Sequence, residues 1–533
     1  MKKRSPLLFS TALVLALLLT YWNSLSGDFL YDDEFLIQKN QVVQNISLLP
    51  KAFITSSTYG SGGTDSFYRP IQILSYGLIH HLFGLNPIAF HAFNLLLHMI
   101  NTILIFFFSL SLLKRVQTNE PLLISFLTAL VWGLHPIHTE AVSYISATAD
   151  PLHFLFGLLF LLFSLSSKWS QKGLGLTFLT LALLSKEASV TFPGLLLAAL
   201  LFNKWTSSKE VSTLSVFWQV LPSLLLSLLY AALRSGPLDF DQSFTFYSAE
   251  NLYTNSILIR AYTGLAALSD YLQLWFWPSH LQIDREFGVY VQWSHFKVII
   301  GILLCLLSLA TFAQFRKRPL LVFIVLWFWA YHSLHTGVVL PLNSIFLEHW
   351  MYVPSFALSL GSFFAISMLT SKLHALSKPL LITLGMVWAV ALSVKTFTQN
   401  KVWASPIRLY NHILEGSPNI ARVHNNLAMA YSDRGERSLA EKHYLKSIEI
   451  QDIYPQVRHN LGLLYLREGK TDLGLSQLKR AIEIDPKFYP SYIYLEKAYE
   501  SLGETRLKNY YQQKALEHQP DIQLQNSRPP SKK

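Results

Sequence analysis

Cysteine and charged residues are scarce in this chain of 533 residues. Its one cysteine, Cys305, cannot form a disulfide within the chain. Only 14% of the residues are charged, against about 25% in ordinary soluble proteins. Hydrophobic residues make up 51% of the chain, 14% of it is aromatic, and the mean hydropathy is +0.31. This composition excludes a water-soluble protein of this size and predicts a multi-pass membrane protein.

Long apolar runs recur through residues 1–400, and a membrane helix needs roughly 20 such residues. The first run follows Lys2, Lys3 and Arg4, as in a signal peptide. No small-residue cleavage site ends it, so we interpret it as an uncleaved first span. The runs predict about eleven spans, at 7–24, 87–113, 120–134, 151–167, 174–188, 189–203, 214–233, 297–313, 319–338, 353–370 and 379–397.

Lysine and arginine predict the orientation of these spans, because cytoplasmic loops are enriched in them. With the amino terminus in the cytoplasm, residues 135–150 and 337–352 lie on the other side and contain neither residue. An odd number of spans then puts the carboxyl-terminal region on the non-cytoplasmic side. This topology largely accounts for the net charge of +11, so no nucleic-acid partner is indicated. The basic residues of the inner loops are Lys2, Lys3, Arg4, Lys114, Arg115, Lys168, Lys172, Lys204, Lys209, Arg316, Lys317, Arg318, Lys372 and Lys378.

One further apolar segment, residues 252–278, does not fit this count. As a span it would move Arg316 to the outer side. We therefore predict an interfacial or re-entrant segment on the outer side, with Asp270, Trp275 and Trp277 at the level of the lipid headgroups.

The carboxyl-terminal part, residues 401–520, repeats with a period of 34 residues. This period is typical of tetratricopeptide repeats, which stack helix pairs into an α-solenoid with a concave groove. Such a groove usually holds a peptide or another protein, although the repeats could instead only brace the membrane domain. Residues 521–533 form a polar tail predicted to be disordered. The repeated positions are Asn426-Leu427, Asn460-Leu461 and Tyr494-Leu495, then Tyr431, Tyr465 and Tyr499, then Gly435, Gly469 and Gly503.

Polar side chains that could take part in catalysis or binding lie in the predicted outer loops. A site at the outer membrane surface would suit a substrate presented partly from lipid. The candidate residues are Asp32 and Asp33, then Arg69, then His135, His138, Glu140 and Asp150, then Lys186 and Glu187, and finally Glu348 and His349. The neighbouring Glu34 is expected to be solvated.

Five motifs in this order resemble the transmembrane and tetratricopeptide-repeat-containing O-mannosyltransferase family. They are "FLYDDEFLIQKN", "FYRPIQILSYGLIHHLFGLNPIAFHAFNLLLH", "GLHPIHTEAVSYISATADP", "LLSKEASVTFP" and "LEHWMYVPS". The resemblance covers nearly the whole chain. It implies an all-α polytopic bundle of the C-type glycosyltransferase fold, followed by the repeats. It also implies transfer of a sugar, mannose or a related hexose, from a polyprenyl-phosphate carrier to a protein hydroxyl, with inversion.

The resemblance assigns the catalytic role to the first loop. A hydroxyl must lose its proton as it attacks the anomeric carbon, and a partly desolvated carboxylate is a suitable base. By similarity, Asp32 is the base and Asp33 supports the loop or an optional divalent cation. Adjacent residues of an extended segment point to opposite sides, so the two are not expected to form an acid/base pair. The alternative is that both acids belong to a solvated loop.

A cation should stabilise the departing lipid phosphate. Lys186 is the first candidate, because a lysine between apolar runs is costly without a partner. The alternative is a solvated Lys186–Glu187 pair at a short turn. Arg69 could also reach the phosphate, and Arg260 and Arg285 are weaker candidates.

His135, His138 and Glu140 have ligand-type side chains, but Pro136 breaks the helix that would put both imidazoles on one face. A metal site is therefore disfavoured. The resemblance instead implies that these residues shape the site and contact sugar or phosphate.

Two positions depart from the family pattern. This chain has Thr148 and His349 where the family usually has arginines. Both changes remove a permanent positive charge, so the donor could differ, could bind more weakly, or activity could be lost. The alternative to an enzyme is an inactive membrane scaffold whose repeats recruit partners. A third possibility is transfer of the sugar to a lipid or a glycan, against which the repeats argue only weakly. The membrane would be the plasma membrane of a bacterium or the endoplasmic reticulum of a eukaryote.

Overall fold

The computed structural model describes residues 6–61, 67–208, 210–236, 238, 240, 251–314, 317–339, 341–342, 344–370 and 376–518. Several predicted features lie outside these described residues. They are Lys2, Lys3, Arg4, Lys209, Arg316 and Lys372 of the inner loops, and the tail at 521–533.

The chain folds into two compact units. Unit 1 comprises Met1–Ile283 and Phe287–Ser405, and unit 2 comprises Asp284–Glu286 and Pro406–Lys533. Both consist of helices, and the described residues contain no β-strand. The prediction of an all-α protein is confirmed.

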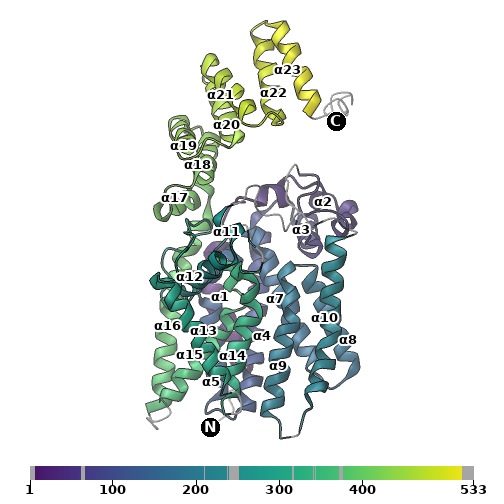
Figure 1. Ribbon diagram of the computed structural model, residues 1–533, viewed down its shortest axis with the longest axis vertical. Coiled ribbons are helices and arrows are strands. Elements are labelled where there is room, and N and C mark those ends of the chain that lie inside the picture. Colours follow the sequence, from purple (N-terminus) through teal and green to yellow (C-terminus); the bar gives the residue numbers. More distant parts are fainter. Residues whose placement is uncertain are drawn as a thin grey trace. The chain divides into compact units, whose positions relative to one another are not determined.

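Each of the eleven predicted apolar runs coincides with a helix of unit 1 (Figure 1). Within the described ranges, seven segments are long and apolar enough to cross a membrane, or eight if one bent pair counts as a span. The structure thus supports a multi-pass protein, while the count of eleven stays a prediction. The helices are α1 (Pro6–Tyr21), α4 (Pro87–Arg115), α5 (Pro121–Leu134), α7 (Ala149–Ser164), α8 (Trp169–Leu183), α9 (Phe192–Thr206), α10 (Thr213–Ser235), α13 (Phe296–Phe312), α14 (Pro319–His332), α15 (Ser355–Thr370) and α16 (Ser377–Asn400).

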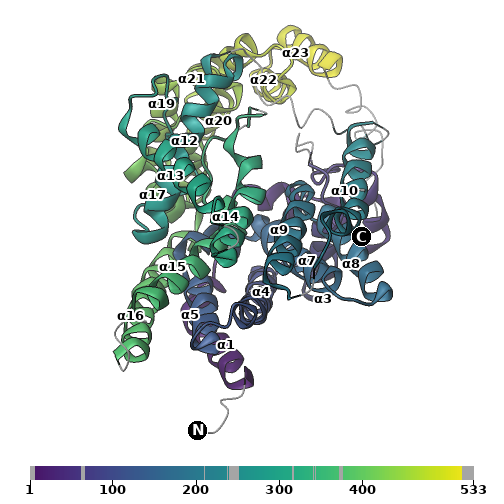
Figure 2. The same cartoon turned by 60° about the horizontal axis from the view of Figure 1, so that its bottom comes forward.

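Large aromatic and aliphatic side chains fill the core of unit 1. Figure 2 shows α1, α5, α15 and α16 gathered on one side of this bundle. Buried indoles fix the start of α15, because Trp132 donates its N–H to the carbonyl of Tyr352 at 3.2 Å and Trp327 donates to that of Val353 at 3.1 Å. The residues just before α15 are therefore held rigidly where site residues lie.

Segment 252–278 forms α11 (Leu252–Asn255) and α12 (Ile257–Phe276). Among the helices the structure describes, α12 is not one of those apolar enough to span a membrane, so its interfacial position stays a prediction. Trp275 does not present its indole at the protein surface, and its depth in the membrane stays a prediction. Its indole is fully buried and stacks on the ring of His135, with centroids 4.4 Å apart.

Unit 2 is a series of helix pairs that stack in chain order (Figure 1). The repeated glycines at 435, 469 and 503 have φ of 78°, 75° and 74° and form the turns within each pair, where glycine avoids the steric penalty of a left-handed backbone. All three repeats predicted from the sequence are therefore helix pairs. The helices are α17 (Pro406–Gly416), α18 (Ala421–Asp433), α19 (Arg437–Ile450), α20 (Pro455–Arg467), α21 (Thr471–Ile484), α22 (Tyr489–Ser501) and α23 (Thr505–His518).

Candidate functional site

The two aspartates of the first loop differ in burial. Their segment is a turn that leads into a short π-helix, η2 (Glu34–Gln38), and is not extended as the sequence suggested. Asp33 is fully buried, whereas Asp32 is exposed. The two carboxylates therefore lie in different surroundings because of this turn, and not because of an alternating strand.

Asp33 holds the loop together. One carboxylate oxygen accepts the backbone N–H of Leu30 at 2.8 Å, and the other accepts the hydroxyl of Ser146 in η5 (Ile145–Thr148). The backbone N–H of Asp32 donates to the hydroxyl of Tyr144 at 3.1 Å. These bonds tie the first loop to the second and leave the side chain of Asp32 at the surface.

The surroundings of Asp33 favour its protonated form. Burial raises the pKa of Asp33 from 3.8 to about 7, and the charge of Asp32 acts in the same direction. The hydrogen bonds from Ser146 and Leu30 lower the pKa but do not offset burial. Asp33 is therefore a structural carboxyl group, and burial raises its pKa toward neutral pH.

We expect Asp33→Asn to remove a pH-dependent loss of stability. Because the folded-state pKa lies above the ordinary value, the folded protein binds this proton more tightly than the unfolded chain. The stabilisation is complete below about pH 4 and is lost as the pH rises to about 7. The melting temperature of the wild type, measured in detergent relative to Asp33→Asn, should therefore fall across this range and level off above it.

The matched control is Asp28→Asn, which removes an exposed aspartate from the same loop. A constant difference between wild type and Asp33→Asn across the range would contradict a proton held by Asp33.

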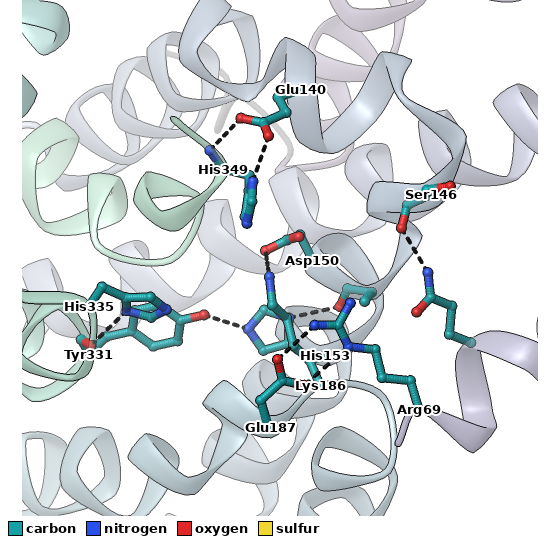
Figure 3. Close-up of polar contacts among 12 residues, drawn as sticks. Arg69, Glu140, Ser146, Asp150, His153, Lys186, Glu187, Tyr331, His335 and His349 are labelled. Carbon is teal, nitrogen blue, oxygen red and sulfur yellow. Dashed lines mark hydrogen bonds and ion pairs between the residues drawn. The ribbon is translucent and has the colours of Figure 1, made fainter. Parts of the chain in front are cut away.

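Two ion pairs, one buried and one partly exposed, form the centre of the charged cluster (Figure 3). The ammonium of Lys186 lies 2.6 Å from the carboxylate of Asp150, and their side chains are only 6% and 5% exposed. The guanidinium of Arg69 donates to both carboxylate oxygens of Glu187, at 2.6 and 3.1 Å. The alternative of a Lys186–Glu187 pair is therefore wrong, because each residue pairs with a partner far away in the sequence.

Local structure places these side chains. Lys186 immediately precedes η6 (Glu187–Thr191), and Asp150 lies in the first turn of α7. Arg69 precedes Pro70, which begins α3 (Pro70–Phe83) with its ring at the first helical position. The helix termini thus bring four charges together.

Arg234 is a charged residue of this region that the sequence reasoning missed. It lies in the last turn of α10 and is 4% exposed. Its charge acts on the carboxylate of Glu187 together with those of Arg69 and Lys186. The signal in the sequence was an arginine at the end of a long apolar helix, where burial needs a partner.

Glu140 and His349 form a second polar link between distant segments. Glu140, in α6 (Thr139–Ser143), accepts the backbone N–H of His349 at 3.0 Å and contacts its Nδ1 at 2.7 Å. The ring of His349 extends from Glu140 toward Asp150 (Figure 3). The neighbouring Glu348 is buried and accepts the N–H of Gln282 at 2.8 Å. Glu348 therefore fixes the backbone, while His349 lies beside the charged cluster.

The two histidines of the second loop are core residues in this structure. The Nε2 of His135 contacts the carbonyl of Trp275 at 2.9 Å, and its Nδ1 accepts the N–H of Ile137 at 3.1 Å. The Nε2 of His138 bonds the hydroxyl of Ser355 at 2.9 Å. Because both rings are fully buried, we do not place them in contact with sugar or phosphate.

Thr148 and Arg260 also have structural contacts. The Thr148 hydroxyl donates to Asn94 at 2.5 Å and the residue is 1% exposed. An arginine at this position would need new space. Arg260 donates to the backbone carbonyls of Val338 and Thr254 at 3.1 and 2.7 Å, so its guanidinium orders the segment around α12.

His153 and Tyr331, which were not among the candidates from the sequence, support the cluster. His153 Nε2 contacts the hydroxyl of Tyr331 at 2.8 Å, which links α7 to α14 (Figure 3).

Within the described ranges, no group of three or more His, Cys, Asp or Glu side chains is placed to hold a metal ion. The optional divalent cation beside Asp32 and Asp33 stays a prediction.

The fold and this cluster define a class: a polytopic helical membrane protein with a charged site between its loops and a repeat domain at its carboxyl end. The Tetratricopeptide repeat family model matches residues 421–454 and 455–488. The chain is 27% identical over 500 residues to Protein O-mannosyl-transferase TMTC1 of Homo sapiens, an alignment that covers 84% of this chain and 55% of that protein.

Two other relatives are also named protein O-mannosyl-transferases. Protein O-mannosyl-transferase F38B6.6 of Caenorhabditis elegans is 24% identical over 82% of this chain and 62% of its own length. Protein O-mannosyl-transferase TMTC2 of Mus musculus is 40% identical over 163 residues, which are 29% of this chain and 18% of that protein. The chain spans little more than half the length of the relatives aligned along most of it. Its resemblance to the transmembrane and tetratricopeptide-repeat-containing O-mannosyltransferase family is confirmed.

Proposed function

We propose that this protein is a membrane glycosyltransferase that moves a sugar, mannose or a related hexose, from a polyprenyl-phosphate carrier to a protein hydroxyl on the non-cytoplasmic side. The observation that carries the proposal is the pair of linked charges Asp150–Lys186, which is buried, and Arg69–Glu187, which is partly exposed, together with the exposed carboxylate of Asp32. Relatives that align with most of the chain and are named protein O-mannosyl-transferases support it.

Asp32 is the proposed base. Its carboxylate takes the proton of the acceptor hydroxyl while the oxygen attacks the anomeric carbon and the bond to the carrier phosphate breaks. The sugar is transferred with inversion, and the phosphate leaves on its lipid. Asp33 orients Asp32 through Ser146 and Leu30.

Arg69 is the proposed contact for the leaving phosphate. Its side chain is 16% exposed and stacks over Phe67, whereas the ammonium of Lys186 is held by Asp150 away from the surface. A planar guanidinium can donate to a phosphate and a carboxylate at once. Lys186 was the first candidate from the sequence, but here it supports the cluster, as do Asp150, Glu187 and Arg234.

Glu140 and His349 would complete the donor side, and Glu348 would hold the backbone of their segment in place. The Glu140–His349 link faces Asp150, so the sugar or phosphate would meet an imidazole where the family usually has an arginine. This exchange alters how the donor is held. No metal ion is assigned to the reaction.

An apolar cavity supports a lipid-linked donor. It has a volume of about 180 Å³ and lies between α12, α13, α14 and α15, with Leu304, Phe328 and Met351 among its lining residues. Met351 belongs to η9 (Glu348–Met351), the same short helix that carries His349. An isoprenoid segment in this cavity would lie next to the segment that holds the polar head.

Purified full-length protein in lipid nanodiscs should transfer radiolabelled mannose from polyprenyl-phosphate-mannose to an unstructured Ser/Thr peptide. A nucleotide-linked mannose should give no product, because it lacks the lipid. Transfer from the nucleotide sugar would contradict the assigned donor. Absence of transfer from any polyprenyl-phosphate hexose would favour the inactive scaffold.

A further inference from the structure

The last segment of unit 1 lies against the first loop. Its short helix η11 (Val402–Ala404) follows α16 and directly precedes α17 in the chain. The backbone N–H of Asp28 donates to the carbonyl of Ala404 at 3.2 Å. The buried Gly27 approaches the same segment so closely that a Cβ there would lie 3.1 Å from the carbonyl oxygen of Trp403. The first loop and η11 therefore pack backbone against backbone.

A buried amide fixes the end of α16, from which η11 continues. The amide oxygen of Asn400, which is 1% exposed, accepts the hydroxyl of Ser143 in α6 at 3.0 Å. Its amide nitrogen donates to the carbonyl of Thr20 at 3.1 Å and to the amide oxygen of Asn23 at 3.0 Å. Trp403, three residues further on, thus follows a backbone that is joined to both α1 and α6.

The indole of Trp403 stacks on the ring of Tyr144. The ring centroids are 5.5 Å apart with planes at 21°, and both residues are buried. The carbonyl of Tyr144 also accepts the amide of the buried Asn94 in α4 at 3.1 Å. With its backbone held by α4 and its ring held by Trp403, Tyr144 places its hydroxyl where it accepts the N–H of Asp32 at 3.1 Å.

Hydrogen bonding does not explain a tryptophan at position 403. Among the side chains that the structure describes, none accepts the buried indole N–H of Trp403. A buried indole usually has such a partner, and its absence is unfavourable. The stacking on Tyr144 does explain an aromatic side chain here, because it holds the tyrosine ring in one orientation.

We propose that η11 positions the first loop and, with it, Asp32. Trp403 holds the ring of Tyr144, and the hydroxyl of Tyr144 holds the backbone of Asp32. Both are positioning residues, because they would act on the acceptor hydroxyl only through Asp32. This role rests on the proposed function, in which Asp32 is the base. The segment that leads into the repeats is thus a part of the site.

Variants of the full-length protein in lipid nanodiscs are compared in two assays. The first measures transfer from polyprenyl-phosphate-mannose to the Ser/Thr peptide, and the second measures hydrogen–deuterium exchange of the first loop by mass spectrometry. Trp403→Leu keeps an apolar side chain but removes the ring. It should lower kcat about ten- to hundredfold and leave the KM for the donor unchanged, because a displaced base slows the chemical step alone. Exchange in the first loop should become faster.

Trp403→Phe retains a ring face and should restore both kcat and the slow exchange. Tyr144→Phe keeps the stacked ring without its hydroxyl and should lower kcat as Trp403→Leu does. The double variant Tyr144→Phe/Trp403→Leu should be no slower than the slower single variant, because both changes act through one contact. The matched control, Trp169→Leu, removes an indole that is 86% exposed at the start of α8 and should leave both assays unchanged.

A wild-type kcat or wild-type exchange in Trp403→Leu would overturn the inference. Equal losses in Trp403→Phe and Trp403→Leu would also overturn it, because they would show that stacking is not the cause. If the wild type transfers no mannose, the proposed function fails and the exchange assay decides alone. Faster exchange in Trp403→Leu that Trp403→Phe reverses would then support the hold of η11 on the first loop, and unchanged exchange would refute it.

Discussion

Replacing Asp32 by asparagine is expected to lower the rate of sugar transfer by about 10²- to 10⁴-fold, the usual contribution of a positioned general base. The side chain is exposed and its backbone is fixed to Tyr144, so an isosteric amide should keep the loop in place. An amide cannot accept the hydroxyl proton. The measurement is the initial rate of transfer from polyprenyl-phosphate-mannose at saturating donor and acceptor.

The control for this change is Glu34→Gln in the same loop. Glu34 pairs with Lys39 at the surface and has no assigned role, so this variant should retain the wild-type rate. Unchanged melting temperatures for both variants would exclude a folding effect. A rate for Asp32→Asn within about twofold of the wild type would refute the assignment of Asp32 as base.

Lys186→Met is expected to destabilise unit 1 by about 3–5 kcal/mol, because it leaves the carboxylate of Asp150 buried without its cation. The thioether fills a similar volume, so lost packing contributes little. The double variant Asp150→Asn/Lys186→Met removes both charges and should recover much of this loss. The measurement is unfolding in detergent, followed by tryptophan fluorescence.

Lys378→Met provides the comparison. Lys378 pairs with Glu120 at 2.6 Å, but both side chains are about 40% exposed, and such a pair contributes under about 1 kcal/mol. Equal stability of Lys186→Met and Lys378→Met would show that the Asp150–Lys186 pair does not hold the cluster together.

The helices of both units could be predicted from the sequence. A long apolar run must satisfy its backbone internally in lipid, so each run became a helix whatever its neighbours. The helix pairs of the repeats could be predicted from the period of the sequence and from the repeated glycines alone. The number of spans was harder, because α8, α13 and α15 are short, at 15, 17 and 16 residues, and their crossing of the membrane depends on context.

The burial of the site residues could not be predicted. The positive φ of Tyr31, 47°, turns the first loop and buries Asp33 while exposing Asp32. A reading of the segment as extended could not reveal this turn. The environment of His135 could not be predicted either. Its side chain is of the kind that binds metals, but in the structure its ring stacks on Trp275.

The sequence by itself determined an all-helical membrane protein with carboxyl-terminal repeats, and it located most of the charged residues of the cluster. It could do so because hydrophobic length, repeat period and isolated charges in apolar surroundings are local properties. Only the tertiary structure decided which charges meet. Lys186 pairs with Asp150 across 36 residues and Glu187 pairs with Arg69 across 118. Ion pairing depends on distance in space, and two charges adjacent in the chain can be drawn to different partners once the helices pack.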